Sequence, residues 1–214
     1  MRDDGLPVKR VNVLEPGARS RPSWISAYIA LSDGKSTDWT KTRSCWQDNR
    51  YVSVNNKRRQ CGICAACMLR RLSVHSANLN ERAETYIWEN LSASSFNDGA
   101  AEGFTKITNA QRQYAIAGTL HLDHLANLKH SRLAEQPLKL ASFQLARSLG
   151  ESEAVVQPKL ERMLSQHEKE WKSFMNSLGP QSFVVQWTGQ PHRASDCRTY
   201  NSSWCAVRSG TALL

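Results

Sequence analysis

Four cysteines in the first third of the chain have the residue type and the spacing of metal ligands. Cys61, Cys64 and Cys67 recur at every third position of the run CGICAAC, and Cys45 lies upstream, separated from Cys61 by fifteen residues. Two consecutive C-x-x-C steps place thiolates on one tight loop, and a fourth sulfur from a separate segment completes the tetrahedron of a structural Zn²⁺ site. The spacing therefore predicts a four-cysteine zinc site. Because protein ligands fill all four positions, this metal would organise the fold and do no chemistry.

Three other kinds of chemistry compete for these cysteines. A C-x-x-C pair can act as a redox dithiol, but that reaction uses two sulfurs and leaves the other two unexplained. An iron–sulfur cluster also uses C-x-x-C-x-x-C, although here no proline follows the last cysteine and the fourth cysteine lies upstream. A disulfide framework is disfavoured, because adjacent C-x-x-C pairs make poor structural staples. Metal analysis and the absorption spectrum distinguish zinc from iron.

Basic residues surround this metal motif. The formal net charge is +9, and residues 41–71 hold eight Lys or Arg against a single acid, Asp48. Four thiolates on one Zn²⁺ carry a net charge of roughly −2, so part of this surplus balances the metal centre. The remainder could contact the phosphate of a nucleotide or of nucleic acid. A nucleic-acid-binding zinc module that uses the run Lys57, Arg58 and Arg59 is therefore an alternative function.

Composition indicates a folded protein of a reducing compartment. The chain has 214 residues, 40% of them hydrophobic, with seven tryptophans, which is typical of one sizeable domain with a core. Six cysteines are too few for a disulfide scaffold of this length. No apolar run approaches the roughly 20 residues of a membrane span, and the first twenty residues lack a signal-peptide core. We therefore expect a soluble cytoplasmic protein that makes no membrane contact.

Helices are predicted on both sides of the metal motif. Residues 1–21 are charged and interrupted by glycine and proline, which predicts a flexible N-terminal segment. The zinc-binding region, residues 22–78, opens with an amphipathic pattern over 22–34. A second helix follows Cys67 and directs its N-terminal amides at the thiolates. His75 lies on the apolar face of that helix, and we expect it to pack there, because four cysteines already fill a tetrahedron.

Residues 79–108 mix helical and loop signals and are expected to connect this region to a helical extension at 109–187. Thr108 and Gln111 have the spacing of a capping box at the start of the next helix. Farther along that helix, His121 and His124 lie three apart on one face. Two imidazoles alone make an incomplete metal or acid–base site, so we expect packed or surface histidines.

The rest of the extension reads as further helices. Pro137 begins a short helix through Leu149, and Gly150 suits the position just after it. An apolar stripe then predicts a helix with Pro158 in its first turn: Leu160, Met163, Leu164, His167, Trp171, Phe174 and Leu178. The opposite face is expected to be solvated: Lys159, Glu161, Lys169, Glu170 and Lys172. These patterns together predict an antiparallel helical hairpin or a small helical bundle over residues 109–179, approximately.

The last part of the chain carries weaker signals. The run SFVVQW, residues 182–187, has the composition of a single strand. Residues 188–214 are rich in Ser, Thr, Gly and Arg without periodicity, which predicts a disordered tail. Cys197 and Cys205 lie there with no recognisable metal spacing and are expected to be free thiols.

The segments TRSCW (42–46) and CGICAACMLRR (61–71) resemble the C-terminal part of 7-cyano-7-deazaguanine synthases. These are ATP-dependent ligases that convert 7-carboxy-7-deazaguanine and ammonia into the nitrile precursor of queuosine and related 7-deazaguanines. The resemblance implies structural zinc on the four cysteines, with Gly62 allowing the loop to turn. It also makes Arg43, Arg70 and Arg71 weak candidates for contacting an anionic substrate or nucleotide. No catalytic residue can be assigned.

The chain departs from this family in two ways. The insert between Cys45 and Cys61 is longer than in typical members, which suggests a divergent branch. The ATP-binding Ser-Gly-Gly-x-Asp-Ser loop of the family has no counterpart in the sequence, and neither does a Walker-type motif. We therefore expect ATP to bind only through a separate nucleotide-binding domain or subunit. By itself the chain, a truncated product or a subunit, should not adenylate anything.

These observations predict a mainly α protein, with a zinc knuckle between helices followed by a helical hairpin or small bundle. It would form the C-terminal part of an α/β nucleotide-binding enzyme. The expected partner is the nucleotide-binding domain or subunit; a second copy of the chain and nucleic acid are secondary candidates. A non-catalytic scaffold that holds a partner through the helical region is a further alternative.

Overall fold

Helices supply most of the regular structure, as the sequence predicts. The computed structural model describes residues 38–47, 53–131 and 134–189. Its α-helices are α2 (Ala65–Ser76), α3 (Asn109–Asn127), α4 (Glu135–Leu149), α5 (Glu153–Leu178) and α6 (Phe183–Gly189). Short 3-10 turns are η1 (Asp38–Lys41), η3 (Ala83–Thr85) and η4 (Leu128–His130). The predicted N-terminal segment, the helix over 22–34 and the tail with Cys197 and Cys205 lie outside the described residues.

A small hairpin precedes α2. Strand β1 (Ser53–Val54) pairs antiparallel with β2 (Lys57–Arg58), with Ser53 opposite Arg58. The two turn residues, Asn55 and Asn56, have φ values of 49° and 59°. A two-residue turn with positive φ at both positions matches the twist of paired strands, and asparagine tolerates that conformation. The hairpin thus returns the chain towards the cysteine run.

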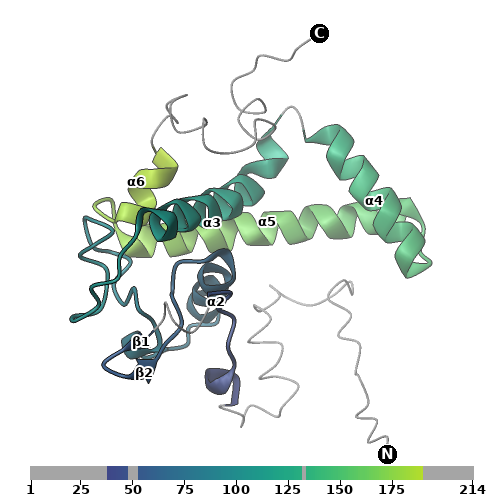
Figure 1. Cartoon of the computed structure of the whole chain (residues 1–214). Coiled ribbons are helices and arrows are strands. Elements are labelled where there is room, and N and C mark those ends of the chain that lie inside the picture. Colours follow the sequence, from purple (N-terminus) through teal and green to yellow (C-terminus); the bar gives the residue numbers. More distant parts are fainter. Residues whose placement is uncertain (1–37, 48–52, 132–133, 190–214) are drawn as a thin grey trace, which may run out of the picture.

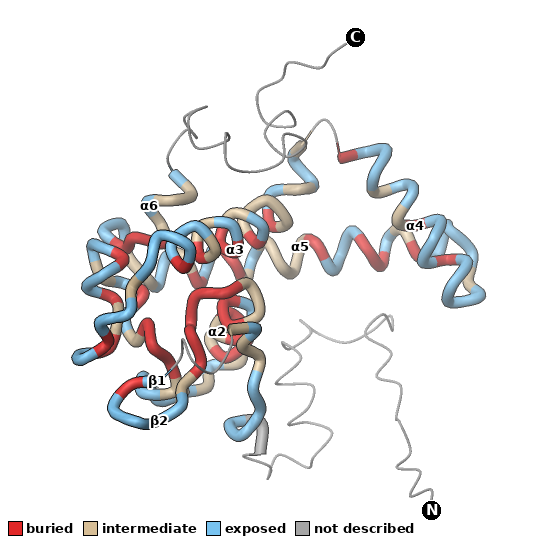
Figure 2. Tube along the Cα trace, in the orientation of Figure 1, coloured by how far each residue is buried: buried red, intermediate tan, exposed pale blue. Residues whose placement is uncertain are grey.

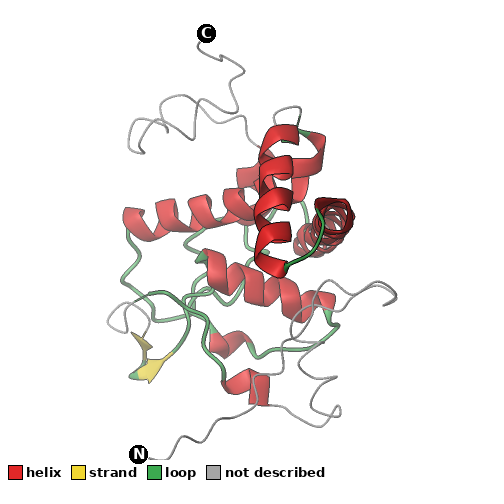
Figure 3. Cartoon of the chain, turned by 90° about the vertical axis from the view of Figure 1, so that its right-hand side faces the viewer, coloured by secondary structure: helices red, strands yellow, loops and turns green. Residues whose placement is uncertain are grey.

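The helices α3 and α5 run alongside each other, and α2 packs beneath them (Figure 1). The helix α4 packs against α5 at the end that lies away from α2 and α6 (Figure 3 gives the view at right angles). The capping box predicted at the start of α3 is confirmed: Thr108 Oγ1 accepts from the Gln111 amide, and Gln111 Oε1 accepts from the Thr108 amide. Gly118 of α3 lies directly against Ala65, the first residue of α2. No helix in the described part of the chain combines the length and apolar character needed to cross a membrane.

The hairpin of α4 and α5 confirms the predicted antiparallel pair. Gly150 follows α4 with φ 68°, the left-handed conformation expected of a residue just after a helix. Three details of α5 were predicted wrongly. Met163, predicted on the apolar stripe, is 46% exposed. The helix begins at Glu153, so Pro158 lies inside it and not in its first turn. Lys159 is 8% exposed, and its ammonium group pairs with Glu151 from the preceding turn at 2.7 Å, which offsets the cost of burying the charge.

The predicted strand at 182–187 is also wrong, because this run forms α6. Ser182 Oγ accepts hydrogen bonds from the amides of Val184 and Val185, at 3.1 and 3.4 Å, which caps the new helix. The same hydroxyl donates to the Leu91 carbonyl at 2.6 Å. Phe183 and Val184 are buried in the core. A serine cap and core packing therefore outweigh the strand preference of the valines.

The segment between α2 and α3 contributes much of the core, although the sequence suggests only a connector. Trp88 is fully buried, stacks on Phe96 at 4.7 Å between ring centroids, and donates its indole N–H to the Phe96 carbonyl. Buried residues cluster where this segment, α2 and α3 meet (Figure 2). Residues 85–88 also run beside the cysteine loop: the Ile87 amide donates to Gln60 O at 2.8 Å and the Trp88 amide to Cys61 O at 3.1 Å.

Candidate metal centre

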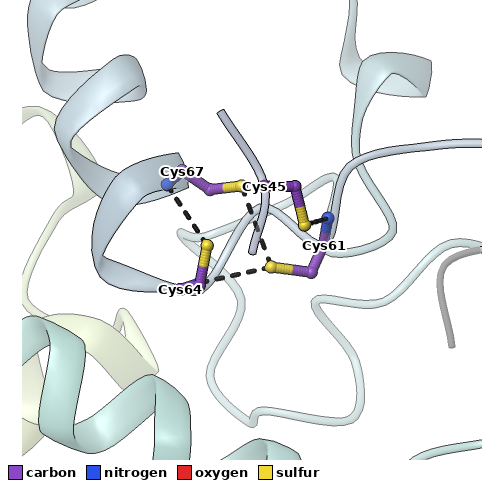
Figure 4. Close-up of side chains that lie close together, drawn as sticks. All are labelled: Cys45, Cys61, Cys64 and Cys67. Carbon is purple, nitrogen blue, oxygen red and sulfur yellow. Dashed lines mark hydrogen bonds between the residues drawn. The ribbon is translucent and has the colours of Figure 1, made fainter. Parts of the chain in front are cut away.

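Three parts of the structure bring the four cysteines together (Figure 4). Cys45 comes from the segment after η1, and Cys61 lies three residues after β2. Cys64 is the N-cap of α2 and Cys67 lies in its first turn. Cys61, Cys64 and Cys67 are buried, and Cys45 is half-buried. The four cysteines predicted as ligands therefore share one site, and this site lies in the core.

The sulfur positions fit one metal ion. All four Sγ atoms lie within 4.8 Å of one another, and those of Cys61 and Cys67 are 3.8 Å apart. With Zn–S bonds of about 2.3 Å, a regular tetrahedron of sulfurs has edges of about 3.8 Å. In a four-iron cluster each thiolate binds a different iron, which requires the sulfurs to lie much farther apart. A disulfide needs sulfurs about 2.05 Å apart, and all four thiols are free.

The backbone amide of each cysteine in the loop donates a hydrogen bond to the sulfur of the cysteine before it. The Cys61 amide donates to Cys45 Sγ at 3.2 Å, the Cys64 amide to Cys61 Sγ at 3.3 Å, and the Cys67 amide to Cys64 Sγ at 3.4 Å. Such N–H groups stabilise negative charge on the sulfur that accepts them. The last of these amides also belongs to the N-terminal turn of α2, where the helix dipole favours an anion. The loop is therefore arranged for thiolates.

The four thiols cannot ionise independently. The hydrogen bond with Cys61, followed by those with Cys64 and Cys67, holds the pKa of the Cys45 thiol far below its usual range. The hydrogen bond with Cys45 raises the pKa of Cys67 and that of Cys61, and burial raises both further. For Cys64 the bond with Cys45 raises the pKa, but those with Cys61 and Cys67 lower it to about 7. The thiols thus share protons that a divalent cation would displace.

Gly62 makes the tight loop sterically feasible. Its φ is +84°, and a Cβ added there would lie 3.0 Å from Arg71 Nη2, from the Trp88 carbonyl oxygen and from Tyr86 Cβ. A larger residue would meet both the strained backbone conformation and these three contacts. The loop therefore turns at Gly62, where only glycine fits without strain.

The three candidate arginines all make contacts within the chain. Arg43 is exposed and donates to the Arg59 carbonyl at 2.9 Å. The Arg70 side chain is 1% exposed and pairs with Glu81 at 2.7 Å; burial opposes its charge, but the hydrogen bond and charge of Glu81 leave its pKa raised. Arg71 lies 3.9 Å above the Tyr86 ring and donates to the Trp88 carbonyl, and burial lowers its pKa. Arg70 therefore contacts an internal carboxylate and is shielded from solvent.

The histidines considered as ligands from the sequence, His75, His121 and His124, do not belong to the cysteine group. His75 Nε2 is 3.1 Å from Ser173 Oγ, and its ring meets Phe174 edge-on, so it packs against α5 as expected. His121 and His124 lie on α3, and Asp123 between them accepts a hydrogen bond from the Trp171 indole at 3.0 Å. Among the described residues, the four cysteines form the one group of three or more metal-ligating side chains.

Two residues near the centre were not singled out from the sequence. Glu81 takes the Arg70 guanidinium on one carboxylate oxygen and the Tyr86 hydroxyl on the other, at 2.5 Å. Both lie in an aperiodic segment, and no spacing rule connects them to the cysteines. The two consecutive arginines Arg70 and Arg71, three and four residues after Cys67, are the signal that the sequence offers for such a partner.

Comparisons with known proteins identify no family for this chain. No family model, no curated protein and no solved structure matches the chain.

Proposed function

We propose that Cys45, Cys61, Cys64 and Cys67 bind one Zn²⁺ that holds the cysteine loop, α2 and the segment before the hairpin together. The observation that carries this proposal is the mutual separation of the four sulfurs, all within 4.8 Å. Four thiolates leave no open coordination position, so the role of the metal is structural. Thiolate ligands also favour a reducing compartment, which supports the cytoplasm as the place of action.

Zinc and a single iron ion both accept a tetrahedron of thiolates, so the identity of the metal needs a measurement. We expect the purified chain to contain one equivalent of zinc and to lack visible absorption. Replacement by Co²⁺ should give the intense thiolate-to-cobalt charge-transfer bands of a four-sulfur site. A double variant, Cys197→Ser and Cys205→Ser, serves as the control and should behave identically. Stoichiometric iron, or no bound metal, would contradict the zinc proposal.

The centre, we further propose, belongs to an ATP-dependent ligase of the 7-cyano-7-deazaguanine synthase type. Support comes from the segments TRSCW and CGICAACMLRR, whose cysteines are the ones that converge in one site. In such a ligase ATP activates the carboxylate of 7-carboxy-7-deazaguanine and ammonia displaces the activating group to form the amide. A second activation by ATP, now of the amide oxygen, then removes that oxygen as the leaving group and yields the nitrile. The chain would supply the zinc-bearing portion, and a nucleotide-binding domain or subunit would supply the phosphate-binding loop. The residues of this chain would form the surface that contacts the nucleotide-binding domain or subunit.

The ligase proposal predicts a dependence on the partner. The chain mixed with ATP, ammonia and 7-carboxy-7-deazaguanine should release neither AMP nor the nitrile. Addition of a co-expressed subunit that carries a Ser-Gly-Gly-x-Asp-Ser loop should start both. Turnover by the chain alone would contradict the expected need for a partner, and absence of turnover by the reconstituted pair would contradict the ligase assignment.

The nucleic-acid alternative has one observation in its favour. Lys57 and Arg58 are exposed on the hairpin, where phosphates could reach them, whereas Arg59 pairs with Glu89. Phosphate contacts release counterions, so binding would weaken steeply with added salt. Salt-dependent binding to DNA or RNA that is lost on replacing Lys57 and Arg58 would favour this alternative over the ligase.

A further inference from the structure

The zinc proposal leaves open what places Cys45 in the site. Cys61, Cys64 and Cys67 lie on one loop, so local geometry brings their sulfurs together. Cys45 belongs to a separate segment, and its sulfur can become a ligand only if that segment is fixed against the loop. The contacts of residues 42–45 therefore determine whether the site has three sulfurs or four.

These contacts converge on α2 and on the residues before the cysteine loop. Ser44 donates from its amide and its hydroxyl to the buried Gln60 side chain, at 2.9 and 3.1 Å. Thr42 accepts two hydrogen bonds from Arg70 Nη1, one on its carbonyl at 3.1 Å and one on its hydroxyl at 2.6 Å. Arg70 thus links α2, the helix that contains Cys67, to the segment that carries Cys45, while Ser44 links that segment to Gln60.

The guanidinium of Arg70 is itself held from the other side. Its Nε and Nη2 both donate to Glu81 Oε1, at 3.0 and 2.7 Å. The Glu81 side chain is 7% exposed, and its second oxygen accepts from the Tyr86 hydroxyl. The planar guanidinium presents donors on two edges at once, so one edge is fixed on Glu81 while the other reaches Thr42. A lysine ammonium has no comparable fork.

We propose that Arg70 is a positioning residue for the metal centre: it binds no metal, but it holds Thr42 and thereby makes Cys45 the fourth ligand. The inference rests on the zinc proposal and adds a specific division of the site. Cys61, Cys64 and Cys67 form a part that the loop builds alone, and Cys45 is recruited through Arg70. Loss of the Arg70 fork should therefore convert a four-sulfur site into a three-sulfur site completed by water.

The test compares Arg70→Met, Arg70→Lys and Glu81→Gln with the unaltered chain. Arg82→Lys, at the exposed arginine that follows Glu81 in the sequence, is the matched control. Each protein is loaded with Co²⁺ or Zn²⁺ and treated with iodoacetamide, and the modified cysteines are identified by mass spectrometry.

In Arg70→Met we expect Cys45 to be alkylated at least about tenfold faster while the other three ligand cysteines stay protected. The metal affinity should be lower by about ten- to a hundredfold. Cobalt charge-transfer intensity should fall from a four-sulfur to a three-sulfur level. Arg70→Lys should behave similarly, Glu81→Gln should show a smaller effect, and Arg82→Lys none.

The outcomes separate this inference from the zinc proposal. Were Arg70→Met and Arg70→Lys to keep four protected cysteines and a four-sulfur spectrum, the positioning role would be wrong while zinc binding stood. Simultaneous exposure of all four cysteines in Arg70→Lys and Glu81→Gln would show a general structural role and also contradict it. If the unaltered chain binds no metal, the zinc proposal itself fails.

Discussion

Replacing Cys64 with serine is expected to abolish metal binding and to unfold the region around α2. Cys64 is fully buried, supplies one of the four sulfurs and caps α2 through the Cys67 amide. Binding of structural zinc contributes about 10–16 kcal/mol in zinc-finger peptides. Folded domains are stable by only about 5–15 kcal/mol in total. Loss of the metal therefore removes a free energy comparable to the whole stability of the fold.

Serine is the informative substitution, because its hydroxyl is a good N-cap and preserves that part of the role of Cys64. The measurement is bound zinc per chain together with the thermal unfolding curve. Cys205→Ser, outside the four ligands, should leave both unchanged. Removal of zinc from the unaltered chain with a chelator should produce the state of the variant, and added zinc should reverse it. A Cys64→Ser protein with full metal content and an unaltered unfolding curve would contradict the proposed centre.

Gly118→Leu is expected to have the second largest effect. Gly118 is buried on α3, and a Cβ there would lie 2.9 Å from the Ala65 amide nitrogen and 3.3 Å from its Cα. Both are backbone atoms next to Cys64, one of the four proposed metal ligands. Overpacking of a rigid contact costs about 1–3 kcal/mol, and here the strain falls directly on a ligand. We expect lower stability and weaker zinc binding together.

Ala117→Leu provides the matched control, since Ala117 neighbours Gly118 on the same helix but is exposed. Chemical denaturation gives the free energy of unfolding, and competition with a chromophoric chelator gives the zinc affinity. The control should change neither by much. If both variants lose stability equally, the contact between α3 and the metal loop is not what requires glycine at 118.

Those parts of the fold that depend on local chemistry were predictable. The cysteine spacing indicated the group of four sulfurs, Thr108 and Gln111 marked the start of α3, and Gly150 marked the end of α4. Each of these features is decided by a few neighbouring residues. The apolar stripe of α5 likewise predicted a helix from Leu160 onwards.

Features decided by distant contacts were missed. Ser182 caps α6 while it also bonds to Leu91, and that tertiary contact is invisible to strand propensity. Lys159 was expected in solvent, but it is buried and pairs with Glu151 across the turn. The pairing of Arg70 with Glu81 was missed as well, because Glu81 lies in a segment without periodicity. A sequence shows where its charged residues are, but it does not show which residues they pair with in the fold.

The hairpin between Cys45 and Cys61 has a consequence for how this chain can diverge. A metal that joins these two cysteines closes a loop of fifteen intervening residues, of which Asn55 and Asn56 form an exposed tip. The entropy of closing a flexible loop grows only logarithmically with length, so doubling it costs about 0.6 kcal/mol. Insertions at this tip are nearly neutral thermodynamically, whereas a one-residue change between Cys61 and Cys67 would displace a sulfur. Length variation among distant relatives of such a centre should therefore accumulate in the long interval and spare the short ones.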